Sequence, residues 1–172
     1  MEGLRVLAAG VFVACVVATS GCAPAVAPVP KEHRMGERVN AGSLQYNVFD
    51  GQWRAQLGEG HEARVPKDRF FIIRLSVANS ASADLMIPAL TLVDDNGQTY
   101  PELSDGSQVP SWMGFLRKAH PAENLQGTVV FDVPPRHYRL RVADENDQKS
   151  EEIDIPLSFA DTPEIPPQAT QQ

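Results

Sequence analysis

Apolar and polar residues alternate along most of the segment between residues 43 and 159. In the run FFIIRLSVAN (70–79), every second residue from Phe71 to Val77 is apolar. Side chains two residues apart point the same way in an extended chain, and the β-branched and aromatic residues of this run favour strands. We therefore expect a strand here that buries one face in a core.

The same alternation recurs in six other short segments. They lie near residues 44–48, 90–92, 98–100, 127–133, 138–142 and 152–159. Asn96-Gly97 is typical of a tight hairpin turn, because both central positions of a type I′ turn need a positive φ. No stretch in this segment keeps a helical period for the length of an ordinary helix. These patterns predict an all-β fold: a single immunoglobulin-like antiparallel β-sandwich of about seven strands.

The N-terminus has the layout of an export signal. Arg5 precedes an apolar run over residues 6–18 that is too short to span a membrane, and Thr19, Ser20, Gly21 and Cys22 follow directly. This ending resembles the lipobox of bacterial lipoproteins, which implies acylation of Cys22 and cleavage before it. We therefore interpret residues 1–21 as a lipoprotein signal peptide. An ordinary signal peptide cut elsewhere and an uncleaved anchor are the alternatives.

Three further segments complete the predicted organisation. Residues 22–42 are rich in proline, alanine and charge without apolar periodicity, which predicts a flexible tether that reaches up to about 60 Å if extended. Residues 43–159 form the predicted sandwich domain. Residues 160–172 contain three prolines and no core-forming pattern, which predicts a disordered tail.

Charge and cysteine content narrow the range of partners. The chain has 15 Lys and Arg against 22 Asp and Glu, a net charge of −7, which argues against binding to nucleic acid. Both cysteines, Cys15 and Cys22, lie in the first 22 residues, so the domain contains no disulfide.

Candidate chemistry is sparse. The four histidines have no metal-binding spacing, and no Gly-x-Ser-x-Gly motif is present. We therefore expect no catalytic, cofactor-binding or metal-binding residues and no enzyme activity, with an envelope hydrolase on an atypical sandwich as an alternative. Residues 144–154 contain six acids, which solvated loop charges explain most simply. A weak calcium-binding or small-ligand module is the other alternative.

One predicted connection is unusually apolar. Trp112, Met113, Phe115 and Leu116 crowd into residues 108–118. One interpretation is a plug that closes an end of the sandwich by burying these side chains. The other leaves Trp112 and Phe115 partly exposed as anchors for a partner. If the domain binds a partner, we expect this loop to carry the contact.

The order of motifs resembles a domain family of unknown function found in bacterial lipoproteins, with an immunoglobulin-like fold similar to immunoprotective extracellular proteins. The residues that carry the resemblance are Asn79, then Asp94, Gly97 and Tyr100, then Gly127, Phe131, Val133 and Pro134. Ala122 stands where the family usually has glycine, which bears on turn geometry. The resemblance implies fold and envelope location but no reaction.

Together these observations predict a membrane-anchored envelope lipoprotein that displays a non-enzymatic binding or structural domain. Its expected partners are the lipid bilayer, through acylated Cys22, and an envelope protein. Ala23 follows the cysteine where an aspartate resembles an inner-membrane retention signal. If the organism is diderm, this favours the outer membrane, facing the periplasm or the cell surface.

Overall fold

Strands make up nearly all of the regular structure in the computed structural model, which describes residues 31–157. The strands are β1 (Glu32–Arg34), β2 (Arg38–Ala41), β3 (Leu44–Arg54), β4 (Phe70–Asn79), β5 (Leu85–Ile87), β6 (Thr91–Val93), β7 (Thr99–Pro101), β8 (Arg117–Ala119), β9 (Asn124–Asp132), β10 (Tyr138–Ala143) and β11 (Ser150–Ile155). Within these residues one 3-10 turn, η1, covers Gly60–Glu62. The all-β prediction is confirmed. Cys22, the predicted signal peptide and the predicted tail lie outside the described residues.

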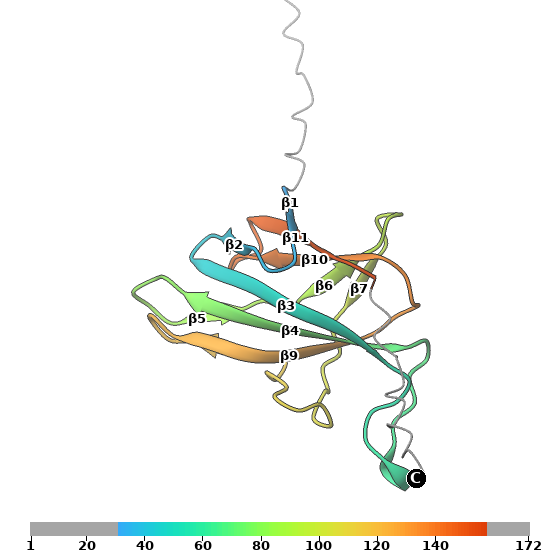
Figure 1. The fold of residues 1–172 in the computed structure, drawn as a ribbon. Coiled ribbons are helices and arrows are strands. Elements are labelled where there is room, and N and C mark those ends of the chain that lie inside the picture. The colour runs from blue at the N-terminus through green and yellow to red at the C-terminus, as the bar shows by residue number, and fades with distance from the viewer. Residues whose placement is uncertain (1–30, 158–172) are drawn as a thin grey trace, which may run out of the picture.

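Two sheets form the layers of a sandwich (Figure 1). One sheet has the strand order β1-β11-β10-β6-β7, and the other has the order β2-β3-β4-β9. Neighbouring strands are antiparallel except β1 and β11, which are parallel. A short ribbon of β5 and β8 completes the fold.

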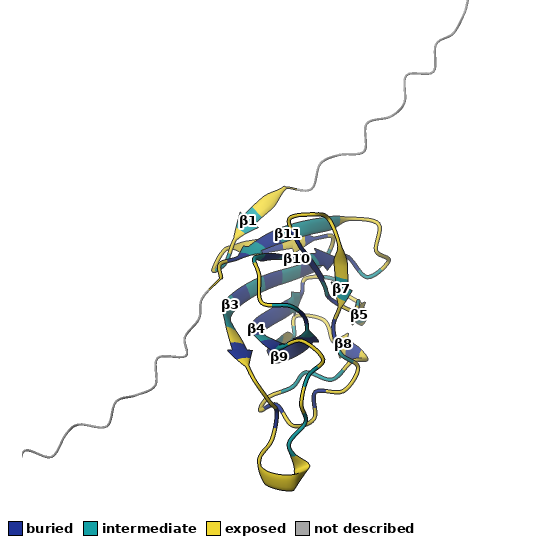
Figure 2. Ribbon diagram, turned by 90° about the vertical axis from the view of Figure 1, so that its right-hand side faces the viewer, coloured by how far each residue is buried: buried dark blue, intermediate teal, exposed yellow. Residues whose placement is uncertain are grey.

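The main core lies between the two sheets, where buried residues line the facing strands (Figure 2). Phe71, Ile73, Leu75 and Val77 are at most 3% exposed, so the face predicted from the alternation in β4 is the buried one. The Tyr46 hydroxyl of β3 donates a hydrogen bond of 2.7 Å to the carbonyl of Ala143. This bond joins the two layers, and burial raises the pKa of Tyr46 above its usual value.

Each of the seven predicted segments contains a strand, and four short strands are additional. Two of these, β1 and β2, lie within residues 22–42, which the sequence predicts to be a tether. The domain therefore begins at Glu32 rather than at residue 43. These strands have only three or four residues each. Backbone pairing with β11 holds β1, none of whose residues is buried. β2 pairs with β3 and buries Val39 and Ala41 in the main core, but an alternation of four residues is too short to indicate a strand by itself.

A second apolar cluster covers the outer face of the four-stranded sheet. Phe70 and Val130, at 1% and 0% exposure, point away from the main core and pack with Leu57 and Val109. Ile72, Leu103 and Trp112 pack against them. Strands buried on both faces have consecutive apolar residues, which explains the doublets in FFII and VV.

Candidate functional site

A buried ion pair stands at the base of the long connection between β7 and β8. The Arg117 guanidinium donates to the Glu102 carboxylate, and both side chains are at most 1% exposed. The Leu90 amide donates to the same carboxylate oxygen at 2.8 Å. Burial raises the pKa of Glu102, against the opposing effects of the Arg117 charge and the Leu90 bond. The pair joins the two ends of residues 103–116, which we call the β7–β8 loop.

The β7–β8 loop is also attached to the edge of β9. The Met113 amide donates to the Thr128 carbonyl at 3.0 Å, and the Thr128 amide donates to the Ser111 carbonyl at 2.8 Å. A Cβ atom added to Gly127 would lie 2.4 Å from the Ser111 carbonyl oxygen. Glycine is therefore required at position 127 because the loop backbone passes directly over it.

The structure separates the four apolar residues that the sequence grouped together. Trp112 and Met113 are half-buried against the two clusters, whereas Phe115 is 37% exposed and Leu116 is 83% exposed. The loop neither buries all four side chains as a plug nor exposes them as one patch. Trp112 and Met113 secure the loop to the sheet, and Phe115 and Leu116 remain accessible.

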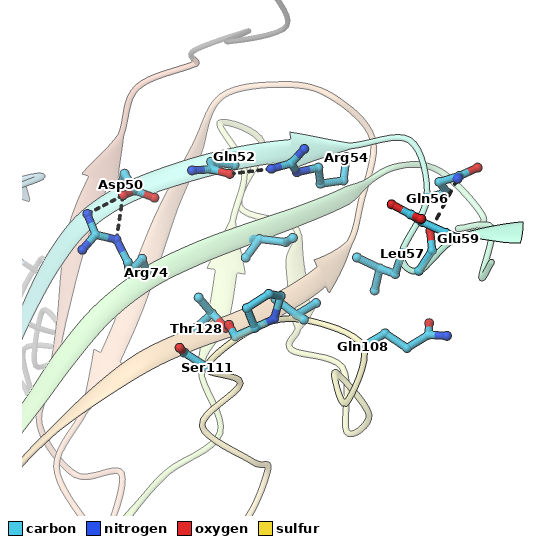
Figure 3. Close-up of a pocket in the computed structure, with 14 residues that line it drawn as sticks. Asp50, Gln52, Arg54, Gln56, Leu57, Glu59, Arg74, Gln108, Ser111 and Thr128 are labelled. Carbon is cyan, nitrogen blue, oxygen red and sulfur yellow. Dashed lines mark hydrogen bonds and ion pairs between the residues drawn. The ribbon is translucent and has the colours of Figure 1, made fainter. Parts of the chain in front are cut away.

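A groove of about 560 Å³ runs between the outer face of β3 and β4 and the β7–β8 loop (Figure 3). Alternate residues of β3, namely Asp50, Gln52 and Arg54, form one wall. Apolar side chains, including Ile72 and Val109, lie among its lining residues. Other lining residues are Gln56, Leu57 and Glu59 from the turn after β3, and Gln108, Pro110 and Ser111 from the loop.

The charged groups of the groove differ in their bonding. Arg74 donates to Asp50 through two nitrogens, at 2.8 and 2.7 Å, so this pair is locally neutral. Arg54 donates to the Gln52 amide oxygen at 3.1 Å. Within residues 31–157 it has no carboxylate partner. Its remaining N–H groups and the Gln52 amide nitrogen are the hydrogen-bond donors that the β3 wall offers to a ligand.

The histidines bond to carboxylates rather than to nucleophiles. His137 is held between Asp95 and Asp154, at 2.9 and 2.5 Å, and these hydrogen bonds raise its pKa. In the part of the chain that the structure describes, no serine, threonine or cysteine bonds to a histidine. The same residues contain no group of three or more His, Cys, Asp or Glu side chains arranged to hold a metal ion.

The acidic segment 144–154 does not converge on one point. Asp144 accepts the Gln148 amide at 2.7 Å within its turn. Asp147 bonds to Arg141, and Glu152 bonds to Arg139, both at 2.7 Å. These carboxylates face separate partners of the protein.

Several residues that carry the family resemblance have structural roles. The side-chain amide of Asn79 donates to the backbone carbonyls of Ala83 and Ala119 at 2.8 and 2.9 Å. Asp94 accepts the backbone amides of Asn96 and Gln98, both at 2.9 Å, which closes the hairpin predicted at Asn96-Gly97. The turn is not the type I′ turn that this dipeptide predicts, because only Gly97 has a positive φ, of 78°. The side chains of Asn79 and Asp94 therefore stabilise the turns around them by hydrogen bonds to the backbone.

The chain belongs to the family described as a domain of unknown function (DUF4352), which matches residues 33–152. The match begins inside β1 and ends inside β11, so it covers nearly the whole described domain. No curated protein matches the sequence.

Solved structures show the same fold. The yjhA protein from Bacillus subtilis is similar with a TM-score of 0.55 and 17% identity, over 72% of this chain and 99% of that one. The secreted protein MPT63 from Mycobacterium tuberculosis is similar with a TM-score of 0.53 and 12% identity, over 75% and 98%. At these identities the likeness shows the β-sandwich alone. Neither the family description nor these neighbours indicates an enzymatic reaction. The described residues contain no helix long and apolar enough to cross a membrane.

Proposed function

We propose that this chain is an exported lipoprotein, anchored through acylated Cys22, whose sandwich is a non-enzymatic module that binds an envelope component. The observation that carries the anchor is the sequence Thr19-Ser20-Gly21-Cys22 directly after a short apolar run. Acyl chains contribute about 0.8 kcal/mol per buried methylene, so multiple chains on one cysteine hold a domain at a membrane durably.

The position of β1 shortens the segment between the proposed anchor and the domain. Because the domain begins at Glu32, only residues 23–31 separate Cys22 from it. At about 3 Å per extended residue, these nine residues reach about 27 Å, roughly half the span predicted for a tether ending at residue 42. The proposed anchor therefore holds the domain close to the bilayer.

The fold supports a binding surface directed away from that anchor. β1 lies at the edge of the five-stranded sheet, whereas β3 and β4 belong to the four-stranded sheet (Figure 1). The groove and the β7–β8 loop lie on the outer face of that second sheet. The two features are on opposite layers of the sandwich. A chain held at β1 would present the groove to the surrounding envelope space. It would also present Phe115 and Leu116, which belong to the β7–β8 loop that lines the groove.

The test is the intact mass of the N-terminal peptide, with fractionation of membranes. Native protein should begin at an acylated Cys22 and remain in the membrane fraction. Cys22→Ser should lose the acyl mass and the membrane association, whereas the matched control Cys15→Ser should retain both. A native chain that keeps residues 1–21, or that carries no acyl mass, would refute the anchor.

A further inference from the structure

The lining of the groove carries no net charge. Its charged residues are two acids and two bases: Asp50 and Arg74, which pair directly, together with Glu59 and Arg54. Equal numbers of both signs within one groove leave little field to attract an anion or a cation. The charges therefore favour an uncharged ligand.

Little apolar surface is open in the groove. Leu57 and Val109 are only 4% and 5% exposed, so neighbouring side chains already cover them. Ile72 is half-buried and Pro110 is exposed, which leaves a small apolar area. An acyl chain or the apolar face of a helix needs a larger apolar surface than these two residues provide. The site therefore suits a polar ligand.

Among the described strands, none lines the groove with a free edge. β3 lies between β2 and β4, and β4 lies between β3 and β9. The edge of β9 is occupied at Thr128, which exchanges backbone hydrogen bonds with Ser111 and Met113. A peptide that binds by adding a strand needs an open edge. The groove therefore does not suit an extended peptide bound through its backbone.

Three glutamine side chains provide both donors and acceptors. Gln52 lies on β3, Gln56 in the turn after β3, and Gln108 in the β7–β8 loop (Figure 3). The Gln52 oxygen accepts from Arg54, and the Gln108 nitrogen donates to a backbone carbonyl at 2.9 Å. In the described part of the chain, the Gln52 nitrogen donates no hydrogen bond, and the oxygens of the other two glutamines accept none. The groove therefore presents both free N–H groups and free C=O groups.

We propose that this groove binds a neutral oligosaccharide. A sugar hydroxyl donates and accepts hydrogen bonds at once, which matches a lining that offers both kinds of group without net charge. Ile72 and Pro110 provide apolar contact for the C–H face of a sugar ring. The groove volume of about 560 Å³ lies within the usual range of small-molecule sites, about 300–1,000 Å³. This proposal rests on the proposed function, because it names the class of envelope component that the domain binds.

The test is ¹H–¹⁵N NMR on the full chain, purified in a detergent that has no sugar headgroup. The probes are the trimer of N-acetylglucosamine and the trimer of glucose, two neutral sugars that differ in their acetamido groups. At least one should shift the side-chain NH₂ signals of Gln52 and Gln108. We expect a Kd of about 1 mM, because the described lining residues include no aromatic ring on which a sugar could stack. The ratio of the two Kd values shows whether acetamido groups contribute.

Two substitutions and a salt titration test the site. Gln52→Ala and Gln108→Ala should each raise the Kd about fivefold, as expected for the loss of one hydrogen bond. Gln126→Ala, at an exposed glutamine of β9 that does not line the groove, is the matched control and should leave the Kd unchanged. Raising NaCl from about 50 mM to about 500 mM should also leave it unchanged, because a neutral ligand forms no ion pair for salt to screen.

Three outcomes would overturn the proposal. They are no shift with either sugar at about 10 mM, an equal loss of binding in Gln126→Ala, and tighter binding of the neutral peptide acetyl-Gly-Ser-Gly-Ser-amide than of both sugars. Failure of the Cys22 mass test would leave these readouts unaffected. A chain that carries the acyl group but binds neither sugar would refute the oligosaccharide and leave the anchor standing.

Discussion

Glu102 and Arg117 form an ion pair inside the protein that joins the two ends of the β7–β8 loop. One Glu102 oxygen and two Arg117 nitrogens are buried without a hydrogen-bond partner among residues 31–157. Pairs of this kind contribute little net stability compared with an apolar core, but the loss of one partner leaves an uncompensated charge. The pair therefore determines where the loop begins and ends more than how stable the domain is.

The first prediction concerns this pair. Arg117→Met should reduce the free energy of unfolding by about 3–5 kcal/mol, because the Glu102 carboxylate remains buried without a cation. Changing both residues to Met should recover much of the loss. Urea denaturation measures both variants. Lys118→Met, at an exposed neighbour in β8, is the control and should stay within about 0.5 kcal/mol of the parent. Equal effects of Arg117→Met and Lys118→Met would contradict the prediction.

Gly127 is expected to control the attachment of the β7–β8 loop. In Gly127→Ala the new methyl group meets the Ser111 carbonyl oxygen, so the loop backbone must move. We expect a loss of about 1–3 kcal/mol in unfolding free energy and faster hydrogen exchange at the Met113 amide. Gln126→Ala, an exposed position in the same strand, serves as the control. Unchanged exchange at Met113 in Gly127→Ala would show that the loop is held elsewhere.

Ala122→Gly should stabilise the protein. Ala122 has a φ of 60°, in the left-handed region where an L residue is strained by about 1–2 kcal/mol. Glycine removes this strain but gains entropy in the unfolded chain, so we expect a net gain of up to about 1 kcal/mol. Ala55→Gly, at an exposed residue without a positive φ, should instead destabilise. Thermal denaturation distinguishes the two directions, and a lower melting temperature for Ala122→Gly would count against the strained turn.

Phe70, on the outer face of β4, tests whether burial on that face stabilises the domain. Phe70→Ala should reduce the unfolding free energy by about 3–5 kcal/mol, as expected for an aromatic residue in a core. Leu116→Ser should change it by less than about 0.5 kcal/mol, because that side chain is largely exposed. Urea denaturation gives both values. A small effect of Phe70→Ala would mean that the second cluster contributes little.

The His137 contacts predict a pH dependence. The hydrogen bonds to Asp95 and then Asp154 raise the pKa of His137 above its ordinary value of 6.5. A raised histidine pKa stabilises the folded state fully below the unfolded pKa, and this contribution disappears as the pH rises through the folded pKa. Since the side chain is 35% exposed, solvent screening limits the effect to less than about 1 kcal/mol.

NMR titration of the His137 ring and urea denaturation at about pH 5.5 and about pH 8.5 measure this effect. His137→Gln should remove the difference in stability between the two pH values that this group causes. His61→Gln, whose side chain is 96% exposed, should leave that difference unchanged. A ring that titrates below 6.5 in the folded protein would refute the prediction.

Alternation alone located the long strands, because each buries a face against the main core. The runs at Phe71–Val77 and at residues 138–142 have this pattern. The Asp94–Gly97 turn depends on local residues, because the Asp94 side chain accepts the Asn96 backbone amide. β1 escaped prediction because backbone pairing with β11, rather than an apolar face, holds it. β2 escaped because only two of its four residues, Val39 and Ala41, point into the core, which is too short an alternation to stand out. The groove escaped it because its walls come from β3, the turn after β3 and the β7–β8 loop, which are distant in the sequence.

The sequence by itself determined the fold class, the hairpin and the main core face of this protein. It also contains the Cys22 motif, which stays a prediction. These features depend on local conformation and on a period of two residues, both of which a single chain segment contains. Only the tertiary structure decided that Trp112 and Met113 secure the loop while Leu116 remains exposed, and that Glu102 meets Arg117. Those outcomes depend on which segments come together in space, and close packing of the whole domain decides that.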